Sequence, residues 1–177
     1  MAIEEDLIDK VKKIKVLLLD VDGVLTDGRI IYDSAGRDLK FFDVHDGLGV
    51  YLLKKAGIPT ILITAKGSRT IKPRARDMQV DCVFAGIFPK TSVLGKILDR
   101  YKVTKDELCF VADDLVDFGL MKKVGLPIAV PGACAEIKKL ASYVTTKEGG
   151  RGAVREVAEL ILKTQGKWDE LIKNYDV

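Results

Sequence analysis

Short apolar runs alternate along the chain with segments whose apolar residues recur at helical spacing. The runs of strand length are VLLLDV (16–21), PTILIT (59–64), CVFAG (82–86), ELCFVADD (107–114), PIAV (127–130) and YVTT (143–146). Helical patterns lie between and after them, at residues 46–57, 68–79, 90–101, around 121–123, 133–141 and 151–164. Such alternation is typical of a mostly parallel sheet covered by helices on both faces. The pattern therefore predicts one α/β domain over residues 1–177, with a Rossmann-like three-layer α/β/α architecture.

The segment directly after the first strand breaks this alternation. Residues 29–44 hold two short extended runs around the sequence DSAG (33–36), whose composition suits a turn. We expect a β-hairpin that projects from the domain over about residues 28–44. Only 18 residues separate Asp27 from Asp46, which is too few for an additional cap domain over the sheet.

Three local signals refine the helix boundaries. Asp46 is expected to cap the N-terminus of a helix that stops at Gly57, because a carboxylate accepts the free N–H groups of a first turn. Pro73 lies in the middle of the 68–79 pattern and predicts a kink or a late start there. After the last helix, residues from about 165 to 177 are expected to form a polar C-terminal tail.

Composition narrows the class of protein without identifying it. With 47% hydrophobic residues, 31% charged residues and a net charge of +3, the chain resembles an ordinary globular protein. No dense basic run favours nucleic acid, and no apolar stretch approaches the roughly 20 residues of a membrane span. The N-terminus lacks the apolar core of a signal peptide, so we expect a cytoplasmic protein with no membrane or nucleic-acid partner. The three cysteines are expected to be buried free thiols.

Carboxylates follow the ends of two predicted strands. Asp20 and Asp22 end the first strand, and Asp113 and Asp114 end the strand at 107–114. Because ligand-binding groups of parallel sheets collect beyond the carboxyl ends of the strands, we expect these side chains to converge. Like charges at one point repel, and a hard divalent cation such as Mg²⁺ is the natural compensation.

Two further residues complete a candidate phosphate site. Thr64 ends another apolar strand and offers a hydroxyl and a backbone N–H, while Lys90 begins a helix and brings a positive charge. A carboxylate nucleophile, a metal ion, a lysine and a hydroxyl together suit phosphoryl transfer through an aspartyl-phosphate.

The order of these motifs resembles that of the haloacid dehalogenase superfamily. D-x-D-G-V-L-T-D from Asp20, then Thr64, Lys90 and A-D-D-L-V-D (112–117) match its four motifs in sequence over about 100 residues. The resemblance implies that Asp20 is the nucleophile and a metal ligand. It implies that Asp22 is the general acid and then the general base, and that its backbone carbonyl is a metal ligand.

The same resemblance assigns the remaining motif residues. Asp113 would bind Mg²⁺, and Thr64 and Lys90 would bind phosphate. Asp114 and Asp117 would lie behind the metal ligands, in contact with them rather than with the ion. An Asp at position 22 is the feature that separates phosphatases of the superfamily from its ATPases.

A narrower resemblance covers roughly residues 14–165. The hairpin, F-F-D-V-H-D-G-L-G (41–49) and G-G-R-G-A-V-R-E (149–156) are similar to the 3-deoxy-D-manno-octulosonate 8-phosphate phosphatase family. This resemblance implies an Mg²⁺-dependent phosphatase that releases the sugar acid for lipopolysaccharide synthesis. It also implies a capless homotetramer whose hairpins meet centrally and whose subunits help to enclose each other's sites.

The chain departs from that family at the substrate loop. Thr64-Ala65-Lys66 stands where T-G-R is usual, and Lys lacks the bidentate geometry of Arg, so Ala65 and Lys66 are candidate substrate contacts with altered recognition. Ala112 likewise replaces the Gly of G-D-D. A nine-carbon 3-deoxy-nonulosonate 9-phosphate phosphatase and a broad-specificity phosphatase therefore remain alternatives. A non-catalytic oligomerisation module is a further alternative, disfavoured by the intact motif residues.

Several residues carry two interpretations. Arg74 belongs to a basic helix face, although the resemblance makes it a substrate contact. Arg151 follows two glycines before a helix and is expected to bind an anion, across a subunit boundary. His45 is expected to be a substrate contact or a surface residue rather than an acid or base. Asp27 is either a turn residue or part of the outer shell of the metal.

Overall fold

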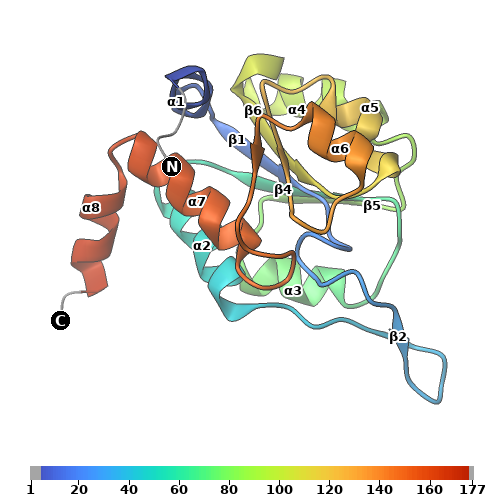
Figure 1. The fold of residues 1–177 in the computed structure, drawn as a ribbon. Helices are drawn as coiled ribbons and strands as arrows, with labels where there is room; N and C mark the ends of the chain where they lie inside the picture. The colour runs from blue at the N-terminus through green and yellow to red at the C-terminus, as the bar shows by residue number, and fades with distance from the viewer. Residues whose placement is uncertain (1–4, 176–177) are drawn as a thin grey trace.

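A six-stranded parallel sheet forms the centre of the protein. The structure is a computed structural model that describes residues 5–175, so residues 1–4 and 176–177 of the expected domain and tail lie outside it (Figure 1). The strands are β1 (Val16–Leu19), β4 (Thr60–Thr64), β5 (Cys82–Ala85), β6 (Leu108–Ala112), β7 (Leu126–Ala129) and β8 (Tyr143–Val144). Their order is β5-β4-β1-β6-β7-β8, and every neighbouring pair is parallel. The predicted fold class is confirmed.

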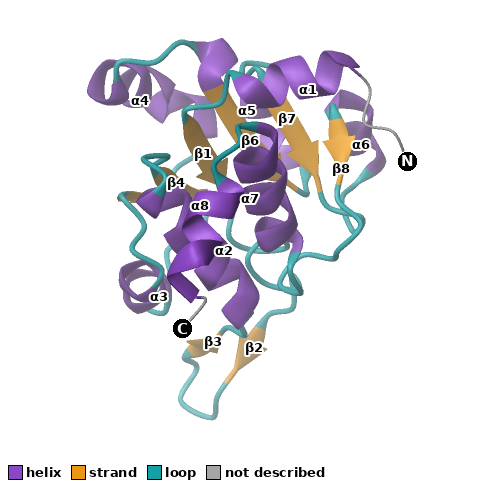
Figure 2. Cartoon of the chain, turned by 90° about the vertical axis from the view of Figure 1, so that its left-hand side faces the viewer, coloured by secondary structure: helices purple, strands orange, loops and turns teal. Residues whose placement is uncertain are grey.

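Helices cover both faces of this sheet and complete the three layers. The helices α1 (Glu5–Lys12), α2 (Val44–Lys55) and α7 (Ala153–Thr164) pack together on one face (Figures 1 and 2). The helices α4 (Leu94–Tyr101), α5 (Phe118–Met121) and α6 (Ala135–Leu140) lie across the other face. Every residue of β1, β4, β6 and β7 is buried, which explains why their sequences are continuous apolar runs.

The predicted hairpin is present and projects from the body of the protein. Strand β2 (Ile31–Tyr32) pairs antiparallel with β3 (Asp38–Leu39), and the pair extends away from the sheet at the bottom of Figure 2. The Asp33 carboxylate accepts the N–H groups of Ala35 and Arg37 and so closes the turn. Between β1 and α2 the chain forms this hairpin and no larger insertion.

Most of the helix boundaries predicted from the sequence are confirmed. The helix α3 (Ile71–Asp77) starts late, and Pro73 lies in its first turn, where a missing N–H costs no helical hydrogen bond. The predicted helix 90–101 begins as a 3-10 turn, Lys90–Val93, before α4. All three cysteines are free, but only Cys109 is fully buried.

Two helices were not predicted from the sequence. The helix α1 precedes β1, and α8 (Trp168–Ile172) lies within the segment expected to be a tail. The indole of Trp168 lies 4.9 Å from Lys163 Nζ and 5.4 Å from the Arg155 guanidinium, so the first residue of α8 packs against α7. Within the described residues, no helix has both the length and the apolar character needed to cross a membrane.

The expectation that Asp46 caps α2 is wrong. The N-cap of α2 is Asp43, whose side chain accepts the N–H of His45 at 2.6 Å. Asp46 is fully buried in the first turn of α2 and accepts the N–H groups of Gly152 at 3.3 Å and Arg155 at 2.8 Å. It therefore caps α7, whose own N-cap is a glycine without a side chain.

We predict that Asp46→Ala lowers the free energy of unfolding by about 1–3 kcal/mol, because two partly buried N–H groups lose their acceptor. Urea denaturation at a fixed protein concentration measures this loss.

The pH dependence of the same loss provides a control. Burial raises the pKa of Asp46 from 3.8 to about 6, against the opposing effect of the N–H groups of Arg155 and Gly152. Between these pH values the folded chain binds a proton at Asp46 and the unfolded chain does not. The stability of the wild type relative to the variant should then rise as the pH falls from about 6 towards 4. A difference that is constant with pH would contradict this account.

Candidate active site

The loop after β1 is shaped by a glycine and a threonine. Asp20 follows the strand and is nearly buried, and its N–H donates to Val111 of β6 at 3.1 Å. The chain then turns through Gly23, at φ +87°, in the left-handed region that favours glycine. The buried Thr26 hydroxyl accepts the N–H groups of Gly23 and Gly28, both at 3.2 Å, and so holds the loop closed.

Gly23 also makes room for a carboxylate from another strand. A Cβ at position 23 would lie 1.9 Å from Oδ2 of Asp113. The glycine of the D-x-D-G motif is thus required twice, once for its backbone conformation and once for the close approach of Asp113.

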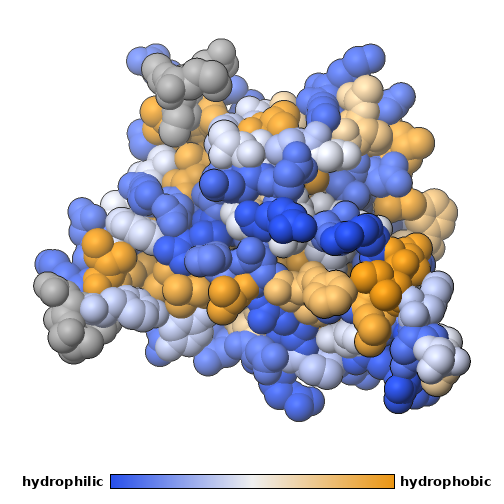
Figure 3. All heavy atoms as spheres, turned by 60° about the horizontal axis from the view of Figure 1, so that its bottom comes forward, coloured by the Kyte–Doolittle hydropathy of each residue, from blue (hydrophilic) through white to orange (hydrophobic). Residues whose placement is uncertain are grey.

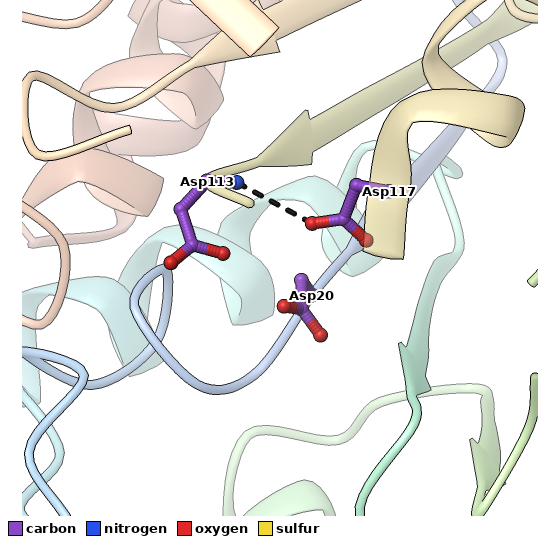
Figure 4. A group of neighbouring side chains, drawn as sticks. All are labelled: Asp20, Asp113 and Asp117. Atoms are coloured by element: carbon purple, nitrogen blue, oxygen red, sulfur yellow. Dashed lines mark hydrogen bonds between the residues drawn. The ribbon is translucent and has the colours of Figure 1, made fainter. Parts of the chain in front are cut away.

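Three carboxylates converge beyond the ends of β1 and β6. Asp20, Asp113 and Asp117 each offer an oxygen, and these oxygens lie within 4.8 Å of one another (Figure 4). The N–H of Asp113 donates to Asp117 Oδ2 at 3.4 Å. Oδ1 of Asp113 is buried and has no hydrogen-bond partner. A buried oxygen without a partner among other carboxylate oxygens fits a hard divalent cation.

Lys90 is the cation buried within this cluster. Its side chain is 1% exposed, and Nζ lies 2.6 Å from Asp20 Oδ1 and 2.5 Å from Asp117 Oδ1. Burial lowers the pKa of Lys90, but the two carboxylates outweigh it and the net shift is upward. The amine is therefore charged.

One lysine does not balance three carboxylates. Burial raises the pKa of Asp113, and the charges of Asp20 and Asp117 raise it further. The pKa of Asp117 is raised in the same way, by burial and then by Asp20. Burial also raises the pKa of Asp20, despite its ion pair with Lys90. The fold alone therefore destabilises the charged forms of these carboxylates, which a bound cation would relieve.

The predicted phosphate-binding residues face the same cavity. Thr64 ends β4 and is buried, and its hydroxyl accepts the N–H of Lys66 at 3.2 Å. A cavity of about 320 Å³ opens here, lined by Asp20, Asp22, Gly28, Ile30, Thr64, Ala65, Lys66, Lys90, Asp113, Asp114 and Val116. The residues expected at strand ends are thus brought together. Asp114 lies at the rim, where it accepts the N–H of Leu115.

The two candidate substrate-binding arginines, Arg74 and Arg151, do not line this cavity. Arg74 donates to the carbonyl of Asp43 at 2.6 Å, stacks 5.4 Å from the Phe42 ring, and lines a larger cavity of about 1140 Å³ between α3 and the hairpin. Lys66 lines both cavities. Arg151 lines a third cavity at the start of α7, which it shares with His45.

The other ambiguous residues are placed as follows. His45 is exposed and contacts Asp43, with 3.1 Å between Nδ1 and Oδ1. Asp27 accepts both side-chain and backbone N–H groups of Arg29, as a turn residue would.

Two glycines near the end of the chain support the loop after β1. The N–H of Gly150 donates to the carbonyl of Val24 at 2.9 Å, and a Cβ on Gly149 would lie 1.8 Å from the carbonyl oxygen of Gly23. These glycines are needed for packing, whatever the role of Arg151.

Sequence reasoning missed one charged neighbour of the site. Lys40, directly after β3, forms a close ion pair with Asp22. The sequence marks Lys40 only as one of several cations in the hairpin region, so only the folded position of the hairpin distinguishes it.

Comparison with known proteins identifies the family. A model of haloacid dehalogenase-like hydrolases matches residues 83–157. The 3-deoxy-D-manno-octulosonate 8-phosphate phosphatase of Escherichia coli (strain K12) is 38% identical over 168 residues, covering 95% of this chain and 89% of that protein. The chain belongs to the 3-deoxy-D-manno-octulosonate 8-phosphate phosphatase family. Its relative from Salmonella typhi is 38% identical over 91% of this chain and 86% of that protein.

Solved structures of this phosphatase family share the fold. The 3-deoxy-D-manno-octulosonate 8-phosphate phosphatase of Moraxella catarrhalis, crystallised with magnesium, phosphate and the sugar acid, superposes with a TM-score of 0.93 at 38% identity. That match covers 96% of this chain and 98% of the other. The cobalt-bound family member from Haemophilus influenzae gives a TM-score of 0.85 at 34% identity, covering 89% and 92% of the two chains.

We predict that Gly23→Ala weakens Mg²⁺ binding by about 10- to 100-fold, because the new methyl group displaces the Asp113 carboxylate. Calorimetric titration with Mg²⁺ measures the affinity.

Gly28→Ala is the matched control. Gly28 has a similar φ of +78°, but the nearest atom to its Cβ would be 3.6 Å away and belongs to Gly23. Both variants carry the left-handed strain of about 1–2 kcal/mol, and only Gly23→Ala should lose affinity. Equal loss in both would contradict the role assigned to the Asp113 contact.

Proposed function

We propose that the protein is an Mg²⁺-dependent phosphatase that converts 3-deoxy-D-manno-octulosonate 8-phosphate to 3-deoxy-D-manno-octulosonate and phosphate for lipopolysaccharide precursor synthesis. The observation that carries the proposal is the buried Asp20–Lys90 ion pair beside Asp113, at the edge of a cavity with Thr64. Membership of the phosphatase family supports the choice of substrate.

The chemistry follows from these positions. Asp20 Oδ attacks phosphorus, and the bond between phosphorus and the sugar oxygen breaks to give an aspartyl-phosphate. Lys90 and the hydroxyl and N–H groups at Thr64 bind the phosphate oxygens as charge accumulates on them. Asp22 gives its proton to the departing sugar alkoxide. It then takes a proton from the water that cleaves the aspartyl-phosphate and frees Asp20.

A magnesium ion would be held by the carboxylates of Asp20 and Asp113 and by the backbone carbonyl of Asp22. The unpartnered Asp113 oxygen and the raised pKa of Asp113 among other carboxylates support this donor set. Asp117 and Asp114 would not contact the ion directly. Asp117 would position the site through its contacts with Lys90 and with the N–H of Asp113. Bound there, the ion supplies charge neutralisation that lets a phosphate dianion approach the carboxylate nucleophile.

The chain is further proposed to work in the cytoplasm as a homotetramer assembled through the hairpin. Four large apolar side chains of this segment, Ile30, Tyr32, Leu39 and Phe41, are between 45% and 64% exposed. Figure 3 brings this face forward and shows apolar surface between strongly hydrophilic regions. In such an assembly, Arg151 is the candidate to reach the site of a neighbouring subunit. Arg74 and Lys66 are candidate substrate contacts.

The substitutions at Ala65 and Lys66 keep a second substrate under consideration. A nine-carbon 3-deoxy-nonulosonate 9-phosphate, or a broad range of phosphomonoesters, would use the same reacting groups with different contacts to the sugar. A non-catalytic role would leave the buried Asp20–Lys90 pair without a purpose.

We predict that Asp20→Asn abolishes phosphate release, by on the order of 10⁴-fold or more, because the amide is not a nucleophile. The chain should remain folded, since Lys90 keeps Asp117 and one excess negative charge is removed. Phosphate-release kinetics and circular dichroism measure the two effects. A folded variant with full activity would rule out the aspartyl-phosphate route.

We predict a higher kcat/KM for the eight-carbon 8-phosphate than for the nine-carbon 9-phosphate, by about tenfold or more, as expected for a site that discriminates by polar contacts. Steady-state kinetics on both sugar-acid phosphates test this. Comparable values would replace the proposed substrate with a broader class, without changing the reaction.

A further inference from the structure

We propose that Lys40 is a positioning residue for the general acid–base, and that it holds one carboxylate oxygen of Asp22 so that the other is free to carry the proton. This inference rests on the proposed phosphatase function. It gives the hairpin a part in the chemistry, beyond any part in assembly.

The burial of Lys40 distinguishes it from other cations of the hairpin. Its side chain is 6% exposed, whereas that of Arg37, at the turn, is 74% exposed. Arg37 pairs with Asp33 within the hairpin, while Lys40 reaches out of it to the loop after β1. Burying a lysine is costly unless it is paired, so the contact with Asp22 is a specific one.

Lys40 lies much closer to Asp22 than to its other carboxylate neighbour, Asp38. Nζ is in close contact with Asp22 Oδ1, and the other carboxylate nearby, Asp38 Oδ2, is 3.9 Å away. Asp22 is 27% exposed and borders the 320 Å³ cavity. Lys40 borders the larger cavity beside the hairpin instead. The ammonium thus contacts Asp22 while Lys40 itself is not among the residues that line the 320 Å³ cavity.

This geometry suits a carboxyl that must act twice. Asp22 gives a proton to the sugar alkoxide and later accepts one from water, so the same oxygen has to lie near both positions. A partner fixed on Oδ1 restricts rotation of the carboxyl group and leaves Oδ2 for the proton. Holding a catalytic group in its productive orientation is a large part of its rate effect.

The test compares leaving groups that do and do not need a proton. Lys40→Met should lower kcat for the alkyl substrate 3-deoxy-D-manno-octulosonate 8-phosphate by about 10- to 100-fold. It should lower kcat for p-nitrophenyl phosphate by no more than about threefold, because nitrophenolate departs unprotonated. KM should change little for either. Equal losses with both substrates would overturn the proposal.

A double-mutant cycle separates positioning from direct contact with substrate. If Lys40 acts through Asp22, Lys40→Met should reduce the residual activity of Asp22→Asn by less than about twofold. If Lys40 instead binds the substrate, the two losses multiply and KM rises, which would also overturn the proposal. Lys40→Arg should restore part of the alkyl-phosphate rate.

Arg37→Met is the matched control, because it removes a hairpin cation that contacts Asp33 rather than Asp22. Its kcat and its oligomeric state by size-exclusion chromatography should match the wild type. Failure of the two proposals is distinguishable. An active Asp20→Asn variant would reject the proposed function, whereas an inactive one beside a fully active Lys40→Met would reject only the role of Lys40.

Discussion

The buried ion pairs of Lys90 with Asp20 and Asp117 are the constraint on which the site depends. A lysine that is 1% exposed is tolerable only when anions lie within contact distance, so the 3-10 turn before α4 must meet the segments that follow β1 and β6. Burial and the neighbouring carboxylates still raise the pKa of Asp113, so its charged form is unfavourable without a further cation. The Lys90 ion pairs thus hold the segments after β5, β1 and β6 together. They also gather the carboxylates that favour a bound cation.

The loop after β1 is supported by distant parts of the chain. Gly149 and Gly150 pack against the backbone at Gly23 and Val24, and the N-terminus of α7 that follows them is capped by Asp46 of α2. The loop is therefore held between residues separated by more than 100 positions. Small residues are needed at these contacts because backbone meets backbone there.

The hairpin carries both an exposed apolar surface and a buried charged contact. Its outer side chains are apolar and exposed, as in a surface that meets another subunit, while Lys40 at its base is buried against Asp22. A change in the position of the hairpin would consequently move the ammonium group that contacts Asp22. The proposed assembly surface and the contact to the proposed acid–base residue thus lie on one short segment of the chain.

The sequence by itself determined the strands, the residues at their ends and the late start of α3, because apolar runs, Asp-x-Asp spacing and Pro73 act through local geometry. It did not indicate that Asp46 caps α7 rather than α2, since Asp43 and Asp46 are equally suitable caps for an adjacent helix. Lys40 and the closeness of Asp117 to Lys90 were likewise decided by tertiary structure. Periodicity reports which face of an element is buried; only folding decides which distant partner a buried charge meets.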